Sequence, residues 1–181
     1  RSSDPSSADI AEEFNTFFTN VGPKLKENIK HVPLPKIDEV NHSMYLKPIT
    51  IDEVREIFDH LDNKYSSGDD DISNVIVKLS SNITISYLTR IINKSFEEGT
   101  FPDDLKNAKV IPLHKAGSKL DENNSRPISL LIVWRKIIER ALFIRINAYM
   151  EYHNLLYNRQ FGFRAKQSTI DALVELVERI K

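Results

Sequence analysis

Lysine and arginine side chains gather in the second half of the chain, where they could bind a polyanion. Residues 102–181 contain 14 Lys and Arg against 9 Asp and Glu, whereas residues 1–101 contain 11 against 17. The excess is steepest over residues 106–166, with 12 basic and 4 acidic side chains. Such a local excess indicates either a surface that faces a polyanion or the solvated faces of amphipathic helices. Charge alone does not separate these two interpretations.

Cysteine, histidine and aspartate give no evidence of a catalytic or metal site in this chain. Cysteine is absent, which excludes disulfides, thiolate metal sites and cysteine nucleophiles. The five histidines are scattered, and none has a carboxylate or a second histidine at catalytic or zinc spacing. Asp69, Asp70 and Asp71 are consecutive in a turn, where carboxylates rarely converge on one ion. We therefore predict no catalytic residue and no metal ligand within this chain.

Helical spacing dominates the first half of the chain. Apolar residues at positions 10, 14, 17, 18 and 21 predict a helix that ends at Gly22-Pro23. Residues 31–48, with three prolines, predict a loop. Thr50 and Glu53 match a capping box, and they predict a helix. A turn at residues 66–71, a short helix over 73–79 and a longer helix over 83–98 follow. The helix that begins after Thr50 is expected to bury Val54, Ile57, Phe58 and Leu61. The helix over 83–98 is expected to end at Gly99 and to bury Tyr87, Leu88, Ile91, Ile92 and Phe96.

One β-hairpin is predicted inside the basic stretch. Residues 109–115 and 126–132 are short apolar runs that predict two strands, joined by a polar turn over 116–124. A long helix over 133–153 and a loop or short strand over 160–164 follow, and Ser168 with Asp171 predicts the cap of a last helix. The fold class is therefore α+β, mainly helical with a β-hairpin. The long helix is expected to bury Ile137, Ile138, Ala141, Leu142, Ile146 and Met150, and the last helix Ile170, Leu173, Val174, Val177 and Ile180.

Four sequence blocks, in order, carry a specific resemblance. They are residues 99–105 (GTFPDDL), 109–117 (KVIPLHKAG), 124–131 (NSRPISLL) and 160–173 (QFGFRAKQSTIDAL). This order resembles the opening blocks of reverse transcriptases from non-LTR retrotransposons, particularly jockey-like mobile elements. Residues 10–21 (IAEEFNTFFTNV) are similar to the stretch that joins the endonuclease to the polymerase in that family.

The resemblance implies a right-hand polymerase fold, of which this chain is the fingers and the start of the palm. It implies RNA-directed DNA synthesis from dNTPs, on an RNA template and a DNA primer. It places Lys115 and Arg126 over the phosphates of the incoming dNTP. A guanidinium can meet phosphate oxygens bidentately, which favours Arg126 over Lys115. The alternative for each is an ordinary surface cation.

The resemblance also places residues 160–166 against the template strand. Gly162 allows the protein backbone to come close to a binding partner, and Arg164 and Lys166 supply positive charge for a sugar-phosphate backbone. Phe161 and Phe163 are candidates for stacking on template bases, although for at least one of them burial in the core is the favoured interpretation. Gln160 completes the predicted template-binding set.

The family's reaction uses two Mg²⁺ ions held by palm aspartates. Those aspartates belong to blocks that are expected beyond this chain, so we expect the isolated 181 residues to incorporate no nucleotide. We expect residues 1–48 to be a linker-like region with one helix, 49–101 a helical region and 102–181 the partial polymerase domain. The expected partners are the endonuclease, palm and thumb regions of the same polyprotein, with no membrane, in the cytoplasm and nucleus. Without the palm, we expect an exposed apolar patch on the last helices.

Several positions depart from the family pattern, including Ser125 where an aromatic residue is usual, Ser118 where an acidic residue is common, and Asp71 in place of a glycine. Together they suggest an element copy no longer under selection for activity. Two alternatives to a reverse transcriptase fragment therefore stay open. One is a degenerate or domesticated fragment that binds nucleic acid without catalysis, and the other is a plain helical scaffold.

Overall fold

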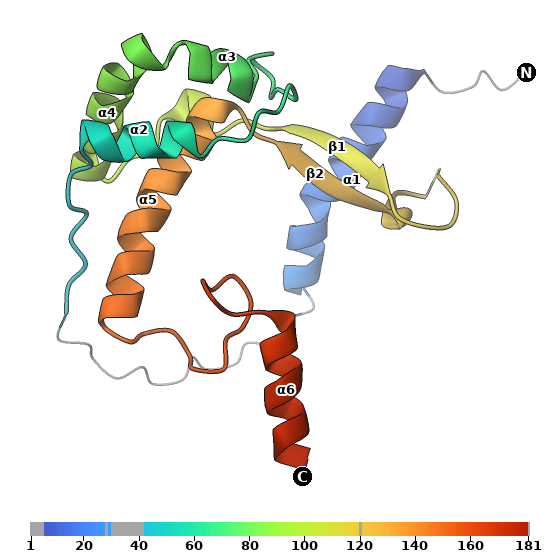
Figure 1. Ribbon diagram of the computed structural model, residues 1–181. Coiled ribbons are helices and arrows are strands. Elements are labelled where there is room, and N and C mark those ends of the chain that lie inside the picture. The colour runs from blue at the N-terminus through green and yellow to red at the C-terminus, as the bar shows by residue number, and fades with distance from the viewer. Residues whose placement is uncertain (1–5, 28, 30–41, 120, 181) are drawn as a thin grey trace, which may run out of the picture.

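The chain folds into six helices and one two-stranded hairpin over the part that we describe. The structure is a computed structural model, and it describes residues 6–27, 29, 42–119 and 121–180. Figure 1 shows α2, α4 and α5 packed together, with the hairpin reaching away from them. The mainly helical fold with a single hairpin is confirmed. The elements are α1 (Ser7–Glu27), α2 (Ile51–Asp59), α3 (Asn74–Leu79), α4 (Ser81–Glu98), β1 (Lys109–His114), β2 (Ser125–Leu130), α5 (Val133–Tyr152) and α6 (Thr169–Ile180), with short 3-10 turns at Asp103–Leu105 and Glu122–Asn124.

One hydrophobic core joins α2, α4 and α5. Its fully buried side chains include Phe58 from α2, Ile92 from α4 and Ile137 from α5. Burial of side chains of this size stabilises a fold by about 1.5–3 kcal/mol each. The core therefore contains residues from both sides of position 101, the predicted boundary between the helical region and the partial polymerase domain. The helix α5 completes this core. The other buried apolar residues are Ile49, Val54, Ile57, Val77, Ile85, Leu88, Val133, Ile138 and Ala141.

The predicted capping boxes are confirmed at two helices. The Thr50 hydroxyl accepts the backbone N–H of Glu53, and the Glu53 carboxylate accepts the N–H of Thr50. Ser168 and Asp171 make the same reciprocal pair before α6. Because these bonds satisfy N–H groups that have no partner within the helix, they fix where each helix begins.

The helix α1 differs from the prediction that Gly22-Pro23 ends it. It continues to Glu27 with Pro23 inside. A proline inside a helix removes one N–H donor, and its ring crowds the carbonyl four residues earlier, so the extension past Pro23 has a cost. Lys24 and Lys26 in the last turn face the negative end of the helix dipole, which favours the extension. Most of the loop predicted over residues 31–48 lies outside the described residues, and residues 42–48 have no regular structure.

Several side chains that were predicted to be buried are exposed. On α4, Tyr87 is 61% and Ile91 48% exposed, and Ile146 on α5 is 40% exposed. On α6, all five residues of the predicted buried face are exposed, and the helix has no buried residue. An amphipathic pattern identifies the apolar face of a helix, but burial requires an element that packs on it. The exposed apolar patch expected on the last two helices is therefore present on α6, whereas α5 has four buried residues.

Candidate functional site

The register of the hairpin places the two predicted phosphate-binding cations on one face. Leu113 of β1 lies opposite Arg126 of β2, and residues directly opposite in an antiparallel pair share a face. The N–H of Lys115 donates to the carbonyl of Asn124 at 2.7 Å, which carries the same register one pair beyond His114. Lys115 is two residues from Leu113, so it also lies on that face. The structure thus brings Lys115 and Arg126 together at the tip.

A network of short-range bonds shapes this tip. Gly117 has φ of 79°, and a Cβ there would lie 2.8 Å from the Asn124 side chain, so another residue would strain the backbone and displace Asn124. The Asp121 carboxylate accepts the N–H of Asn123 and the side-chain amide of Asn124. The tip is therefore ordered by its own side chains, and it holds the ends of both strands in register.

The two tip cations have no partner within the described part of the chain. Both side chains are exposed, and neither forms an ion pair or a side-chain hydrogen bond with another described residue. Exposed apolar residues continue the same face toward the helices, with Ile111 at 43%, Leu113 at 55% and Ile128 at 42% exposed. The face therefore combines a positive tip with an apolar surface beside it.

The predicted template-binding loop presents one aromatic ring to solvent and half buries the other. Phe163 is fully exposed and has φ of 60°, a conformation that bulky side chains rarely adopt. Phe161 is half-buried. Gln160 donates to the carbonyl of Gly162 at 3.4 Å, and a Cβ on Gly162 would meet nothing within 4 Å. The space beside Gly162 is therefore open, and its close approach to a template strand stays a prediction.

Arg164 and Lys166 differ in their surroundings. Two nitrogens of Arg164 contact the Glu151 carboxylate of α5, at 3.3 and 3.1 Å, and a third reaches the carbonyl of Tyr157 at 3.5 Å. Lys166 is exposed and has φ of 61°. Arg164 therefore anchors the loop to α5, whereas the charge of Lys166 stays available to a ligand.

The hairpin tip and the loop are separate in the structure. No hydrogen bond or ion pair among the described residues joins them, and they lie at different places along the molecule in Figure 1. The structure therefore brings Lys115 together with Arg126, but it does not bring this pair to residues 160–166.

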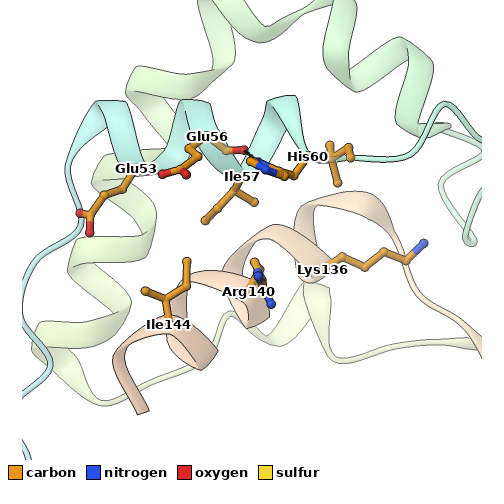
Figure 2. Close-up of a pocket in the computed structure, with 8 residues that line it drawn as sticks. Glu53, Glu56, Ile57, His60, Lys136, Arg140 and Ile144 are labelled. Carbon is orange, nitrogen blue, oxygen red and sulfur yellow. Dashed lines mark hydrogen bonds between the residues drawn. The ribbon is translucent and has the colours of Figure 1, made fainter. Parts of the chain in front are cut away.

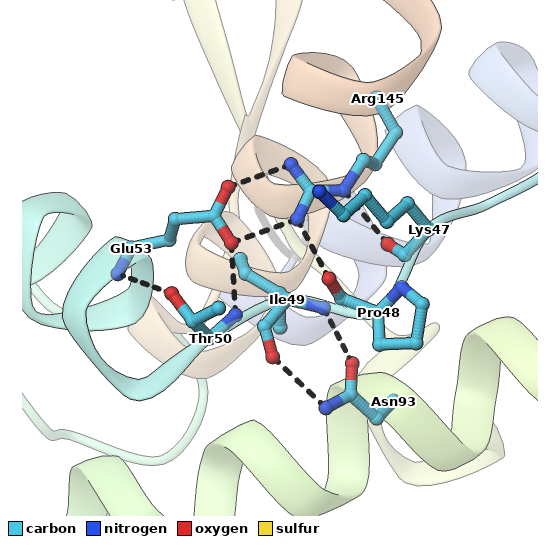
Figure 3. Close-up of polar contacts among 7 residues, drawn as sticks. All are labelled: Lys47, Pro48, Ile49, Thr50, Glu53, Asn93 and Arg145. Atoms are coloured by element: carbon cyan, nitrogen blue, oxygen red, sulfur yellow. Dashed lines mark hydrogen bonds and ion pairs between the residues drawn. The ribbon is translucent and has the colours of Figure 1, made fainter.

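Arg145 of α5, which the sequence analysis did not select, joins α5 to residues 47–53 (Figure 3). The guanidinium of Arg145 donates to both Glu53 carboxylate oxygens at 2.8 Å, to the carbonyl of Lys47 at 2.8 Å and to that of Pro48 at 3.0 Å. On the other side of this segment, the amide of Asn93 exchanges two bonds with the backbone of Ile49. Residues 47–50 are therefore clamped between α4 and α5.

The electrostatics of Glu53 follow from this clamp. The Arg145 hydrogen bonds hold the pKa of Glu53 down at about 2, against partial burial, which acts in the opposite direction. The same pair raises the pKa of Arg145. The sequence signal for Glu53 was its capping box, but nothing in the sequence pointed to its second partner 92 positions later.

Among the described residues, no group of three or more His, Asp or Glu side chains could hold a metal ion. No helix in the described ranges is long and apolar enough to cross a membrane.

Comparison with known proteins gives relatives over most of the chain. It is 34% identical over 139 residues to a probable RNA-directed DNA polymerase from transposon BS of Drosophila melanogaster, a match that covers 76% of the chain. It is 31% identical over 136 residues to the RNA-directed DNA polymerase from mobile element jockey, and 33% over 148 residues to the probable polymerase from transposon X-element, both of the same organism. No protein-family model matches the chain.

These matches cover only 15 to 16% of the length of the relatives. The resemblance that the four sequence blocks predicted is nevertheless confirmed by relatives at 31 to 34% identity over about three quarters of the chain. The chain therefore belongs to the family of RNA-directed DNA polymerases from mobile elements, and it corresponds to a short segment of those longer proteins.

Proposed function

We propose that this chain is the substrate-gripping segment of an RNA-directed DNA polymerase, in which the hairpin tip binds the phosphates of an incoming dNTP. One observation carries the proposal: Lys115 and Arg126 share a face of the hairpin, and both are exposed without a partner in the described residues. A triphosphate carries several negative charges, and two cations on one face can neutralise part of that charge together. The planar fork of Arg126 can bind two oxygens at once.

Anisotropy of a fluorescently labelled dNTP tests the hairpin assignment. We expect Arg126→Gln to weaken binding about tenfold, because a hydrogen bond to a charged group contributes about 1.5–3 kcal/mol, and Lys115→Gln to weaken it less. Lys109→Gln is the matched control. Lys109 is an exposed cation on the same face, roughly 20 Å along the strand from Lys115. Equal losses in the control and the tip variants would refute the assignment.

The loop at residues 160–166 is proposed to contact the RNA template. Phe163 supports this role, because its ring is fully exposed and is held in a conformation that points to a functional constraint. We propose that Phe163 stacks on a template base and that Lys166 meets the backbone. Arg164 positions the loop through Glu151, and Gln160, Phe161 and Gly162 form the rest of the contact surface.

Binding of a labelled single-stranded RNA tests the loop. Stacking of one base on an aromatic ring is worth about 1–3 kcal/mol, so Phe163→Ala should weaken binding by about 5- to 150-fold. Tyr65→Ala is the control, since Tyr65 is 82% exposed outside the loop. If both variants bind RNA as the unchanged chain does, Phe163 has no part in template binding.

The same proposal extends to the parts that surround this segment. We propose that residues 102–181 form the fingers and the start of the palm, preceded by a helical region at 49–101 and a linker-like region at 1–48. The DNA primer, the endonuclease, palm and thumb regions and the two Mg²⁺ ions are then partners supplied by the rest of the polymerase. The isolated chain should accordingly bind substrates without extending a primer.

A further inference from the structure

The helix α5 carries four cations that divide into two kinds. Arg135 pairs with Glu139 at 2.8 Å, and Arg145 pairs with Glu53 at 2.8 Å. Lys136 and Arg140 are exposed, and neither forms an ion pair with any described residue. Because these two are four residues apart, they lie one helical turn apart on the same face of α5, with their Cβ atoms roughly 6 Å from each other.

This face of α5 forms one wall of a cleft against α2 (Figure 2). The cleft has a volume of about 580 Å³, with Lys136, Arg140 and Ile144 on the α5 side. Glu56 and Ile57 line it from α2, and His60 lines it directly after the end of α2. Apolar side chains from both helices thus lie between charged groups, and the cleft can receive a ligand that is both anionic and partly apolar.

The charge balance of the cleft is positive. Glu53 also lines it, but its carboxylate is neutralised by Arg145, which holds the pKa of Glu53 at about 2. Glu56 is then the acidic side chain that opposes Lys136 and Arg140. Removing Glu56 should strengthen the binding of an anion, and this opposite sign gives the cleft a test of its own.

An aromatic ring lies beside the cations. The guanidinium of Arg140 lies 5.1 Å from the centre of the Phe143 ring, and Phe143 is 46% exposed. A cation stacked on an exposed ring is a surface on which a nucleobase can also stack. Phosphate-binding cations next to a stacking surface are the combination that single-stranded nucleic acids use. The carboxylates of an acidic peptide, in contrast, would not stack on this ring.

We propose that the α2–α5 cleft is a further nucleic-acid contact, in which Lys136 and Arg140 bind adjacent phosphates of a single strand beside Phe143. It rests on the proposed function only in that the protein binds nucleic acid. This cleft is distinct from the hairpin tip and from the loop at residues 160–166. It would extend the nucleic-acid-binding surface onto the helical part of the molecule.

Salt-dependent binding of a labelled single-stranded RNA to the full chain tests this proposal. Each phosphate contact contributes about 0.7 to the slope of log K against log salt for single strands. The double variant Lys136→Gln/Arg140→Gln should therefore lower the slope by about 1.4 and weaken binding roughly 25-fold at about 0.1 M salt. Glu56→Gln should tighten binding. All three residues are exposed, and circular dichroism verifies that the variants stay folded.

The matched control is Arg90→Gln/Lys94→Gln on α4. These two are exposed cations at the same spacing beside the exposed ring of Tyr87, on another helix, and Lys94 forms an exposed ion pair with Glu98 at 3.5 Å. Equal weakening by both double variants, or no binding by the unchanged chain, overturns the cleft. Competition by polyglutamate as strong as that by RNA also overturns it, in favour of an acidic protein partner.

The dNTP measurement separates this inference from the proposed function. If the cleft variants leave RNA binding unchanged while Arg126→Gln weakens dNTP binding, the cleft proposal is refuted and the hairpin assignment is retained. If the cleft variants weaken RNA binding while the hairpin variants bind the dNTP as the unchanged chain does, the hairpin assignment is refuted and the cleft proposal is retained.

Discussion

Replacement of Arg145 by methionine should destabilise the fold more than any other single change to a charged residue considered above. Methionine keeps much of the length of the side chain but removes four hydrogen bonds, two to Glu53 and one each to the carbonyls of Lys47 and Pro48. The Arg145 side chain is only 11% exposed, but its carbonyl acceptors belong to the exposed residues Lys47 and Pro48. Water can therefore reach these carbonyls once the guanidinium is removed, and each lost hydrogen bond costs about 0.5–1.5 kcal/mol.

The pKa of Glu53 gives an independent magnitude. A pKa lowered from 4.5 to about 2 corresponds to roughly 3 kcal/mol, since each pKa unit is worth about 1.4 kcal/mol. Because the Glu53 side chain is 36% exposed, solvent screening reduces this to about 2 kcal/mol. With the lost carbonyl bonds, Arg145→Met should lower the free energy of unfolding by about 2–4 kcal/mol near pH 7.

Urea unfolding followed by circular dichroism measures this loss. The control is Arg55→Met, because Arg55 pairs with Asp52 in an exposed position, at 55% and 92% exposure, and such pairs contribute about 0–1 kcal/mol. The folded pKa of Glu53 is below its ordinary value, so its contribution is complete above about pH 4.5 and is lost as the pH falls toward 2. That loss should be clearly smaller in Arg145→Met, where only the hydrogen bonds from Thr50 still lower the pKa of Glu53. Equal effects of the two substitutions, or an unchanged pH dependence, would refute the reasoning.

Three further substitutions test other parts of the fold. Thr50→Ala removes the hydroxyl that accepts the N–H of Glu53, and thermal unfolding should show a loss of about 1 kcal/mol; no loss would mean that the cap is not formed. Gly68→Ala places a Cβ 2.7 Å from the backbone nitrogen of Ile132, so urea unfolding should show a loss of more than about 1 kcal/mol, and a neutral result would place the loop elsewhere. Leu173→Glu on α6, where Leu173 is 59% exposed, should change stability by less than about 0.5 kcal/mol; a large loss would show that this face is covered.

Local patterns were sufficient to predict the elements themselves. The capping pair of Thr50 and Glu53 and the paired apolar runs of the hairpin depend on residues a few positions apart, and both are confirmed in place. The glycine that ends α4 is also confirmed, with Gly99 at φ of 63°. Such features are encoded by neighbouring residues, so a single sequence is enough to predict them.

Features that depend on distant partners were not predictable. Tyr87 and Leu173 lie on apolar helix faces, but their exposure depends on which element packs there, and periodicity does not say. Arg145 was one cation among twelve in the basic stretch, and two of its four hydrogen bonds go to backbone carbonyls, which have no sequence signature. For the candidate site, Lys115 and Arg126 were selected through the family resemblance, and the register of the hairpin places them on one face. The anchoring of Arg164 by Glu151 required the fold.

The clamp on residues 47–50 has a consequence for the order in which the molecule forms during synthesis. Ile49 is held by Asn93, which follows 44 positions later, and Glu53 by Arg145, which follows 92 positions later. Closing loops of this length costs entropy before any contact offsets it. While the ribosome is still making α5, the apolar faces of α2 and α4 have no third partner, so we expect the nascent chain to stay sensitive to proteases. Protection should arise in one step once Arg145 has left the exit tunnel.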